Sequence, residues 1–322
     1  MNTQTIAQTD ALTARAALST IIEPGDGVAG TLVDALGPVA AFEAITGNSL
    51  RAALRDAGVG ERTASDSIAR WTPHISSSII AANLAAIADA GVTLVDPDTV
   101  PALADLGVQR PVALYVRGEA SLLTAPRPIT VVGARASTGY GEFITSEIVS
   151  DLAAHQVTIL SGAAYGIDGA AHRAALGAGI PTIAAMAGGV SRAYPAGHSE
   201  LISRIAEHGA VISEVPMSAA PTRWRFLSRN RILAALARVV IVTEGGWRSG
   251  SLNTAGHAAA LGRGLGAVPG PLTSAASSGC HRLIREHNAT LITNAHDILT
   301  LLNGEMNPLA SSARSRLIQI VR

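Results

Sequence analysis

An arginine-rich segment, TRWRFLSRNRIL, occupies residues 222–233. Its members of interest are Arg223, Arg225, Arg229 and Arg231, the aromatic residues Trp224 and Phe226, and Asn230. No acidic residue lies between Glu214 and Glu244. Arginine neutralises backbone phosphates, and aromatic rings offer faces on which nucleobases stack. The pattern favours contact with a nucleic acid over the alternative, a solvated helix start with two aromatic side chains in the core.

A second phosphate-binding pattern follows at residues 238–251. An apolar run, RVVIVT, leads into EGGWRSGS, and a helix is expected from about Ser251. Backbone N–H groups and hydroxyls at such a helix start hold phosphate, which predicts contacts at Arg248, Ser249, Gly250 and Ser251. Glu244 is a general base in a catalytic interpretation; in a binding interpretation it orients Arg229, Arg231 or a base edge. Trp247 either stacks on a base or fills the core.

Two earlier glycine turns give weaker signals. VVGAR places Arg135 just beyond a predicted strand, where a helix N-terminus and an arginine together attract anions. In SGAAYGIDGAAH (161–172), Asp168 and His172 are four residues apart on one helical face. They form an acid–base pair, or Asp168 occupies the helix N-terminus while His172 packs nearby. The second interpretation is favoured.

The usual catalytic and metal-binding motifs are missing from the sequence. All 24 basic residues are arginine, so there is no Walker A lysine. Neither HExxH nor G-x-S-x-G occurs, and the single cysteine, Cys280, cannot build a zinc site. We therefore predict no catalytic residue, no metal site and no cofactor.

Short apolar strands alternate with helices from about residue 76. Strands are expected at 111–118, 128–135, 157–162, 181–189, 210–214, 238–244 and 265–270, with helices at 141–155 and 167–177. This alternation is typical of an α/β protein with a mostly parallel sheet and helices on both faces. Ligands of such sheets bind beyond the carboxyl ends of the strands, where the glycine turns of this sequence lie.

The two ends of the chain depart from this pattern. Residues 1–75 consist of short helical stretches separated by glycines, which predicts a small helical domain of the SAM or helix-hairpin-helix kind. Residues 1–110 carry 6 Arg against 12 acidic residues, which favours a structural or partner-docking role there over DNA binding, whereas residues 111–300 carry 15 Arg against 11 acids. Residues 301–322 predict a linker and the start of a missing or truncated C-terminal module.

The sequence also indicates the cellular compartment of the protein. No apolar run reaches the roughly 20 residues of a membrane span, and the N-terminus lacks the basic and apolar pattern of a secretory signal. One cysteine excludes an internal disulfide framework. We expect a cytoplasmic protein that does not contact a membrane.

Several motifs occur in one order along the chain: VVGAR, SGAAYGIDGAAH, GGVSRAYP, SEVP, RNRI, and EGGWRSGSLNTAGHAAALGR followed by AVPGP and GCHRLIREH. In these motifs, over roughly residues 75–300, the chain resembles the DNA-processing protein A (DprA/Smf) family. The resemblance implies an extended Rossmann-like domain over residues 76–300 that binds single-stranded DNA without sequence preference. It also implies a homodimer that protects incoming DNA and loads a RecA-type recombinase during natural transformation.

The resemblance also implies which residues form the DNA pocket: Arg135, Ser161, Gly162, Arg229, Asn230, Arg231, Glu244, Arg248, Ser249 and Gly250. Arg248 stands where the family often has lysine, which keeps the charge. Many members carry a C-terminal winged helix, which here is absent or cut off after SARSRLIQIVR.

Two other functions stay open at this point. Related Rossmann-like phosphoribohydrolases cleave the N-glycosidic bond of nucleotides with a glycine-rich loop and a glutamate, for which Glu244 is the candidate. Their PGGxGTxxE motif is only echoed by EGGWRSGS. The third function is an interaction scaffold that uses the N-terminal helices. We favour the non-catalytic DNA-binding protein.

Overall fold

A computed structural model describes residues 11–304 and shows a mixed α/β protein. This part of the chain divides into two compact units. The first unit comprises residues 11–117, 187–192 and 212–225, and the second comprises 118–186, 193–211 and 226–304. The first unit is therefore discontinuous in sequence, because the chain returns to it twice.

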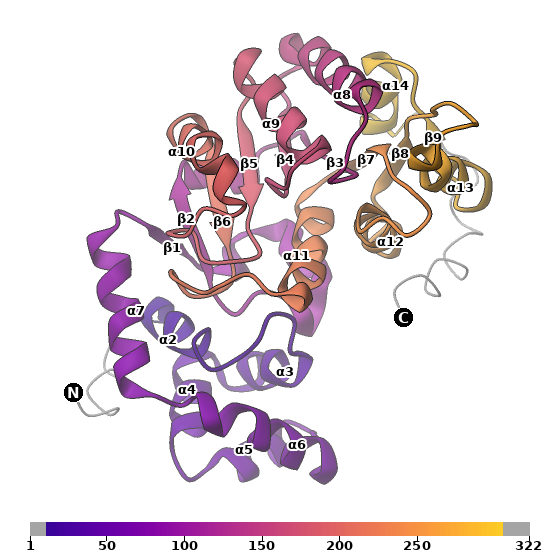
Figure 1. The fold of residues 1–322 in the computed structure, drawn as a ribbon. Helices are drawn as coiled ribbons and strands as arrows, with labels where there is room; N and C mark the ends of the chain where they lie inside the picture. The colour runs from indigo at the N-terminus through magenta and orange to yellow at the C-terminus, as the bar shows by residue number, and fades with distance from the viewer. Residues whose placement is uncertain (1–10, 305–322) are drawn as a thin grey trace. The chain divides into compact units, whose positions relative to one another are not determined.

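The strands form a nine-stranded sheet in the order β1-β2-β6-β5-β4-β3-β7-β8-β9 (Figure 1). Their bounds are β1 Thr93–Val95, β2 Leu114–Gly118, β3 Pro128–Gly133, β4 Thr158–Ser161, β5 Thr182–Ala185, β6 Ala210–Ser213, β7 Val239–Glu244, β8 Gly264–Ala267 and β9 Thr290–Leu291. β1 runs antiparallel to β2, whereas the pairs β3–β4, β3–β7, β4–β5, β7–β8 and β8–β9 are parallel. The predicted mostly parallel sheet is confirmed.

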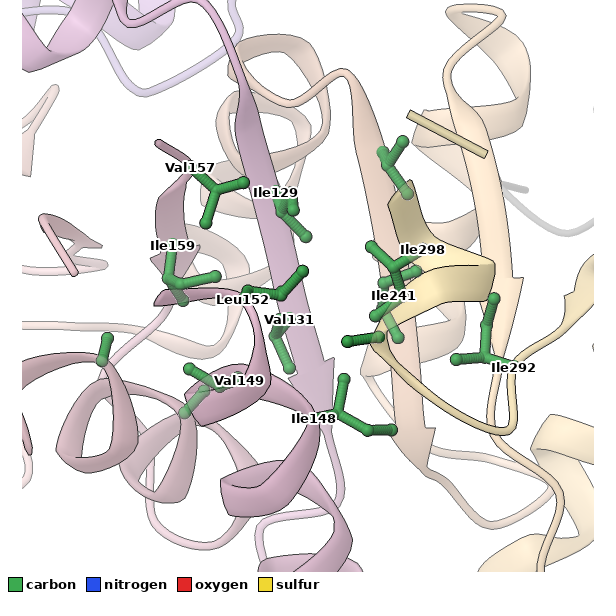
Figure 2. Packing of buried hydrophobic residues seen from close by; sticks show 14 of the residues in the cluster. Ile129, Val131, Ile148, Val149, Leu152, Val157, Ile159, Ile241, Ile292 and Ile298 are labelled. Atoms are coloured by element: carbon green, nitrogen blue, oxygen red, sulfur yellow. The ribbon is translucent and has the colours of Figure 1, made fainter. Parts of the chain in front are cut away.

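Helices cover both faces of the sheet in the second unit. They are α8 Gly139–Asp151, α9 Ile167–Gly177, α10 Ser199–His208, α12 Ser251–Ala260, α13 Ser278–Glu286, α14 Ala295–Leu302 and most of α11 Arg223–Leu236. Successive residues of a strand point to opposite faces. Ile129 and Val131 of β3 pack with residues of α8, α9 and α14 (Figure 2). Thr130, between them, donates a hydrogen bond to the Leu233 carbonyl of α11 on the other face.

The first unit is a helical bundle with a short sheet edge. Its helices are α2 Ala11–Leu18, α3 Gly27–Leu36, α4 Pro38–Thr46, α5 Leu50–Asp56, α6 Glu61–Trp71 and α7 Ser77–Asp89. Asp26 caps α3 by accepting from the backbone N–H groups of Val28 and Ala29. The same carboxylate accepts from the Nε1–H of buried Trp71, which ties α6 to the start of α3.

Segment 212–225 is held to the early helices within the first unit. The Met217 backbone N–H donates to Asn83 Oδ1 at 3.0 Å. Asn83 donates in turn to the Tyr115 hydroxyl at 2.9 Å. Arg225 makes a bidentate ion pair with Glu23, in which Nε donates to Oε2 at 3.0 Å and Nη2 donates to Oε1 at 2.6 Å. Residues more than a hundred positions apart in sequence are therefore joined by polar contacts within this unit.

Short 3-10 helices connect the main elements: η1 Thr72–His74, η2 Pro97–Thr99, η3 Pro101–Gln109, η4 Ala120–Thr124, η5 Ala153–His155, η6 Ala196–His198 and η7 Ala275–Ser277. Within residues 11–304 no single helix has the length and apolar composition of a membrane span, and α3 and α4 meet that test only when they are counted together across a 118° bend. The domain boundary at residue 75 stays a prediction. The predicted C-terminal linker and module lie outside the described residues beyond residue 304.

Candidate nucleic-acid interface

Exposed cationic and aromatic side chains gather on the loops that follow the parallel strands of the second unit. These loops lie at one edge of the sheet, because the carboxyl ends of neighbouring parallel strands point the same way. The side chains are Arg135 after β3, Tyr165 after β4, Tyr194 after β5, and Trp247 and Arg248 after β7. The rings of Tyr165, Tyr194 and Trp247 are 44 to 55% exposed, so their faces are accessible to a ligand.

Arg135 is stacked on an aromatic ring. Its guanidinium carbon lies 4.4 Å from the centre of the Phe226 ring, close enough for a cation–π interaction. The Phe226 ring in turn lies 5.7 Å from the ring of Tyr194, centre to centre. A positive charge and two aromatic faces are thus presented together, one from the β3 loop, one from α11 and one from the β5 loop.

Glu244 holds the start of α8. Its Oε1 accepts from the Thr138 hydroxyl at 2.7 Å, and its Oε2 accepts from the Thr138 backbone N–H at 2.8 Å. Thr138 is the N-cap of α8 and accepts from the Gly141 N–H. A side chain at Gly141 would overlap the Glu244 carboxylate, so glycine is required there. With 2% exposure and both oxygens engaged, Glu244 fixes the β3 loop to the end of β7.

Arg229 is a buried side chain that supports the loops at this edge of the sheet. Its side chain is 5% exposed, and Nη1 donates to the Ala185 carbonyl at the end of β5. The guanidinium lies against Gly162, where a Cβ atom would overlap it. Burial lowers the pKa of Arg229 to about 10, the Asp168 carboxylate opposes that shift, and Arg135 adds to it. Arg229 therefore stays protonated at neutral pH, and the Asp168 carboxylate stabilises its positive charge.

Asp168 belongs to the same buried cluster. It lies in the first turn of α9 and accepts from the Gly162 backbone N–H at 3.1 Å. Burial raises the pKa of Asp168, while Arg229 and the backbone N–H groups of Ala164 and Gly162 lower it. Ser161, fully buried, donates to the Val131 carbonyl at 2.6 Å.

Two further residues of RNRI also point inward. Asn230 is 8% exposed and donates to the Gly250 carbonyl and to Asn253 Oδ1, at 3.4 and 3.1 Å. Arg231 is buried and donates to the Ser228 carbonyl at 2.8 Å. These contacts place Asn230 directly under the start of α12, and they orient Arg231 along its own helix.

The loop before α12 presents Arg248 to solvent. Ser249 and Ser251 are joined through their hydroxyls at 2.8 Å, and Gly250 is the N-cap of α12. Ser251 itself is buried. The predicted phosphate contacts thus separate into an exposed part, Arg248 with Gly250, and an inner part that shapes the turn.

Arg223 and Arg225 belong to the first unit. Arg223 is exposed, as is Trp224. Arg225 is paired with Glu23 and also donates to the Ala220 carbonyl at 2.9 Å. The charge of Arg225 is thus compensated within the first unit, and Arg223 is the exposed arginine of the two.

Asp168 and His172 bond to different partners rather than to each other. His172 Nδ1 lies 2.8 Å from the Thr182 hydroxyl, whereas Asp168 accepts from Gly162. Burial lowers the pKa of His172 to about 3, so the ring is neutral. This is the packed arrangement that the sequence favoured. Within residues 11–304 no group of three His, Cys, Asp or Glu residues could hold a metal ion.

Three residues of the edge were not found from the sequence. Tyr165 and Tyr194 lie in turns whose sequence signal is their glycines, and a single tyrosine in a turn does not indicate that its ring is exposed. Thr138 caps α8, and its signal was available, because a threonine before a predicted helix is a common N-cap. The burial of Arg229 also had a signal: Leu233 and Leu236 follow it at helical spacing of four and seven, so Arg229 shares their apolar face.

Comparison with known proteins gives consistent matches. A family model described as DNA recombination-mediator protein A matches residues 91–303. Putative DNA processing protein DprA of Mycobacterium tuberculosis is 52% identical over 201 residues, which cover 62% of this chain and 51% of that protein. Protein Smf of Escherichia coli is 41% identical over 190 residues, 59% of this chain and 50% of its own. The chain spans about half the length of these two relatives.

Solved structures match as well. The X-ray structure of DNA processing protein A from Streptococcus pneumoniae superposes with a TM-score of 0.73 at 28% identity, covering 91% of this chain and 98% of that one. A structure concerned with the single-stranded DNA binding mode of the Helicobacter pylori protein gives a TM-score of 0.59 at 28% identity, covering 67% and 97%. The similarity therefore extends from the sequence motifs to the fold that carries them.

Proposed function

Because the chain belongs to the DNA recombination-mediator protein A family, we propose that it binds single-stranded DNA without sequence preference. The H. pylori relative, whose structure concerns a single-stranded DNA binding mode, supports the choice of ligand. Binding of this kind needs cations for the backbone and aromatic faces for the bases. Both are present on the loops at the carboxyl edge of the sheet.

The stack of Arg135, Phe226 and Tyr194 carries the proposal. The Arg135 guanidinium supplies a fixed charge for a phosphate, and the Tyr194 ring, 44% exposed, offers a face to a base. Every nucleobase has such a face, so a stacking site of this kind tolerates any sequence. Arg248 and the N-terminus of α12 supply a further phosphate position after β7.

The buried members of the predicted pocket are assigned a supporting role. Ser161, Gly162, Arg229, Asn230 and Glu244 make their contacts to the protein itself, as described above, and they hold the loops that carry Arg135 and Arg248. The positive charge of Arg229 also adds to the potential at this edge. Removing one of these residues would therefore weaken DNA binding through the shape of the loops.

Hydrolysis of a nucleotide N-glycosidic bond is not proposed. That reaction requires a carboxylate that is free to reach the substrate. Both Glu244 oxygens instead accept hydrogen bonds from Thr138. The geometry gives Glu244 an orienting role toward Thr138, whereas the binding interpretation of the sequence expected it to orient Arg229, Arg231 or a base edge.

Family membership also supports a wider role. We propose that the protein acts in the cytoplasm as a homodimer, protects DNA taken up during natural transformation and loads a RecA-type recombinase on it. The full-length relatives are about twice as long as the matched region. The activities of the whole protein are thus part of the proposal.

Fluorescence anisotropy of a labelled oligo-dT, titrated at several salt concentrations, tests the DNA-binding proposal. Arg135→Ala should weaken binding about ten-fold, as expected for one charge-assisted contact, and reduce the slope of log K against log salt by about 0.7. Arg238→Ala is the matched control. It removes the same charge from an exposed position before the amino end of β7, at the opposite edge, and should change the affinity less than about two-fold.

Equal losses in the two variants would show that only net charge matters and would remove the assigned interface. A chain that binds no oligo-dT at low salt would remove the proposed function altogether.

A further inference from the structure

Trp247 is held in the open on the loop after β7. Its side chain is 55% exposed. The guanidinium carbon of Arg282, on α13, lies 4.6 Å from the centre of the indole ring. The core-filling alternative for Trp247 is therefore wrong, and the exposed ring has an arginine on it.

The backbone fixes this loop to the start of α13. The Gly245 N–H donates to the Ala276 carbonyl at 2.8 Å, and the Gly279 N–H donates to the Gly245 carbonyl at 2.7 Å. A Cβ atom at Gly279 would lie 2.6 Å from the carbonyl oxygens of both Gly245 and Gly246, so only glycine allows the approach. These backbone contacts lie two residues before Trp247 and three residues before Arg282, and they bring the two side chains together.

Arg282 is also positioned from its other side. Its Nε–H donates to Glu286 at 3.1 Å, one helical turn further along α13. Arg248 follows Trp247 directly in the sequence. The site therefore combines a large aromatic face with two arginines, the composition expected where a base stacks and its phosphate is neutralised.

The loop with Trp247 is tied to the loop with Arg135. β3 and β7 are parallel neighbours, with Gly133 opposite Glu244 in the register. Glu244 then bonds to Thr138, three residues after Arg135. Neighbouring strands lie about 4.8 Å apart, so the two loops start from adjacent points of one edge. One extended strand of nucleic acid that crosses this edge meets both.

We propose that Trp247, backed by Arg282, is a second base-stacking position, at which a nucleotide of the same single strand is bound beyond the one at Arg135. The inference rests on the proposed function, since it names a position on the same DNA. It assigns the contact to the base rather than to the phosphate. It also explains why the ring is supported by a cation instead of being buried.

Tryptophan fluorescence separates this site from others. The chain has three tryptophans, of which Trp71 is buried and Trp224 is exposed. In a Trp224→Phe background, titration with oligo-dT should quench the signal of Trp247. An oligonucleotide of the same length and charge with abasic sugars is the matched ligand control. It should bind through its phosphates and leave the fluorescence almost unchanged.

Affinities complete the test. Trp247→Ala should weaken oligo-dT binding at least about five-fold, because stacking of one base contributes a factor of about five or more. Trp247→Phe should restore most of the loss, and the salt slope should stay constant in both variants since no phosphate contact is removed. Circular dichroism of each variant checks that the fold is retained.

Three results would overturn the inference. Oligo-dT binding with unchanged Trp247 fluorescence and an unchanged affinity of Trp247→Ala would remove the stacking position and leave the proposed function intact. A fall in molecular mass on sedimentation of Trp247→Ala, without a change in DNA affinity, would assign the ring to a contact between copies of the chain. No binding of oligo-dT by the unaltered chain would remove the proposed function, and this inference with it.

Discussion

Replacing Gly162 by alanine tests whether the buried contacts of Arg229 stabilise the fold. A Cβ atom at this position would overlap Nη1, Nη2 and the guanidinium carbon of Arg229. The guanidinium must move away from the Ala185 carbonyl and from Asp168. Gly162 is not among the glycines with positive φ, so the backbone itself accepts alanine. The effect of the substitution then comes from the displaced side chain.

The magnitude follows from the contacts that are lost. A hydrogen bond from a charged donor contributes about 1.5 to 3 kcal/mol, and weaker electrostatic attraction between Arg229 and buried Asp168 adds to this loss. Alanine also stabilises the folded state by about 0.4 to 1 kcal/mol, because it restricts the conformational freedom of the unfolded chain. We expect Gly162→Ala to lower the free energy of unfolding by about 3 kcal/mol, with partial relaxation of the arginine included. Urea denaturation followed by circular dichroism measures this change.

Two controls identify the cause. Gly177→Ala makes the same substitution at the last residue of α9, where a Cβ atom meets nothing within 4 Å, and it should leave the stability equal or slightly higher. In an Arg229→Ala background, Gly162→Ala should add little further loss, because the atoms that it displaces are gone. A Gly162→Ala protein as stable as the unaltered one, or full additivity with Arg229→Ala, would refute the reasoning.

Three further predictions concern buried groups. Burial lowers the pKa of His172 to about 3 from 6.5, so the unfolded chain takes up a proton below pH 6.5 while the folded chain does not, and stability is lost as the pH falls towards 3. Between pH 6.5 and 5 the unaltered protein should lose about 2 kcal/mol more than His172→Gln in urea titrations; parallel pH profiles would contradict this. Burial raises the pKa of Cys280 to about 12, so iodoacetamide at pH 8 should alkylate it at least about a hundred-fold more slowly in the folded protein than in urea, and mass spectrometry showing equal rates would contradict its burial. Glu244→Gln replaces one acceptor oxygen that faces Thr138 by an amide donor, and should cost about 1 to 3 kcal/mol of stability, whereas the same change at exposed Glu207 should cost almost nothing; an equal cost at both positions would remove the capping role of Glu244.

The order of strands and helices was predictable because its signals are local. The helix predicted at 167–177 is α9 without a shift, and the strand predicted at 238–244 differs from β7 by one residue. Apolar runs bounded by glycine identify such elements whatever they pack against. The antiparallel pairing of β1 with β2 had no local signal, because strand direction depends on the path of the chain between them.

The residue types of the site were predictable from the sequence, but which of their side chains are buried and which are exposed was not. The sequence predicts that the arginines of 222–233 face a nucleic acid, since arginine neutralises phosphates and aromatic residues lie between them. Helical spacing places Arg229 on the apolar face of α11, but Asp168 and Gly162, which it meets there, come from more than 60 residues earlier in the chain, and no local pattern reports those contacts. The aromatic partners of the edge depend in the same way on which strands are neighbours. That is why Tyr194 was found only in the structure.

The discontinuous first unit has a consequence for the order of events during synthesis. Its helical core, from Ala14 to Ile80, can pack as soon as those residues have emerged. Asn83, however, receives its hydrogen bond from Met217, and Glu23 receives its ion pair from Arg225. At about 5 to 20 residues per second, the ribosome needs about 5 to 20 s to make the chain between residues 117 and 225. Throughout that interval the early helices present Glu23 and Asn83 without these partners, and the strands of the second unit begin to be made before the first unit is complete.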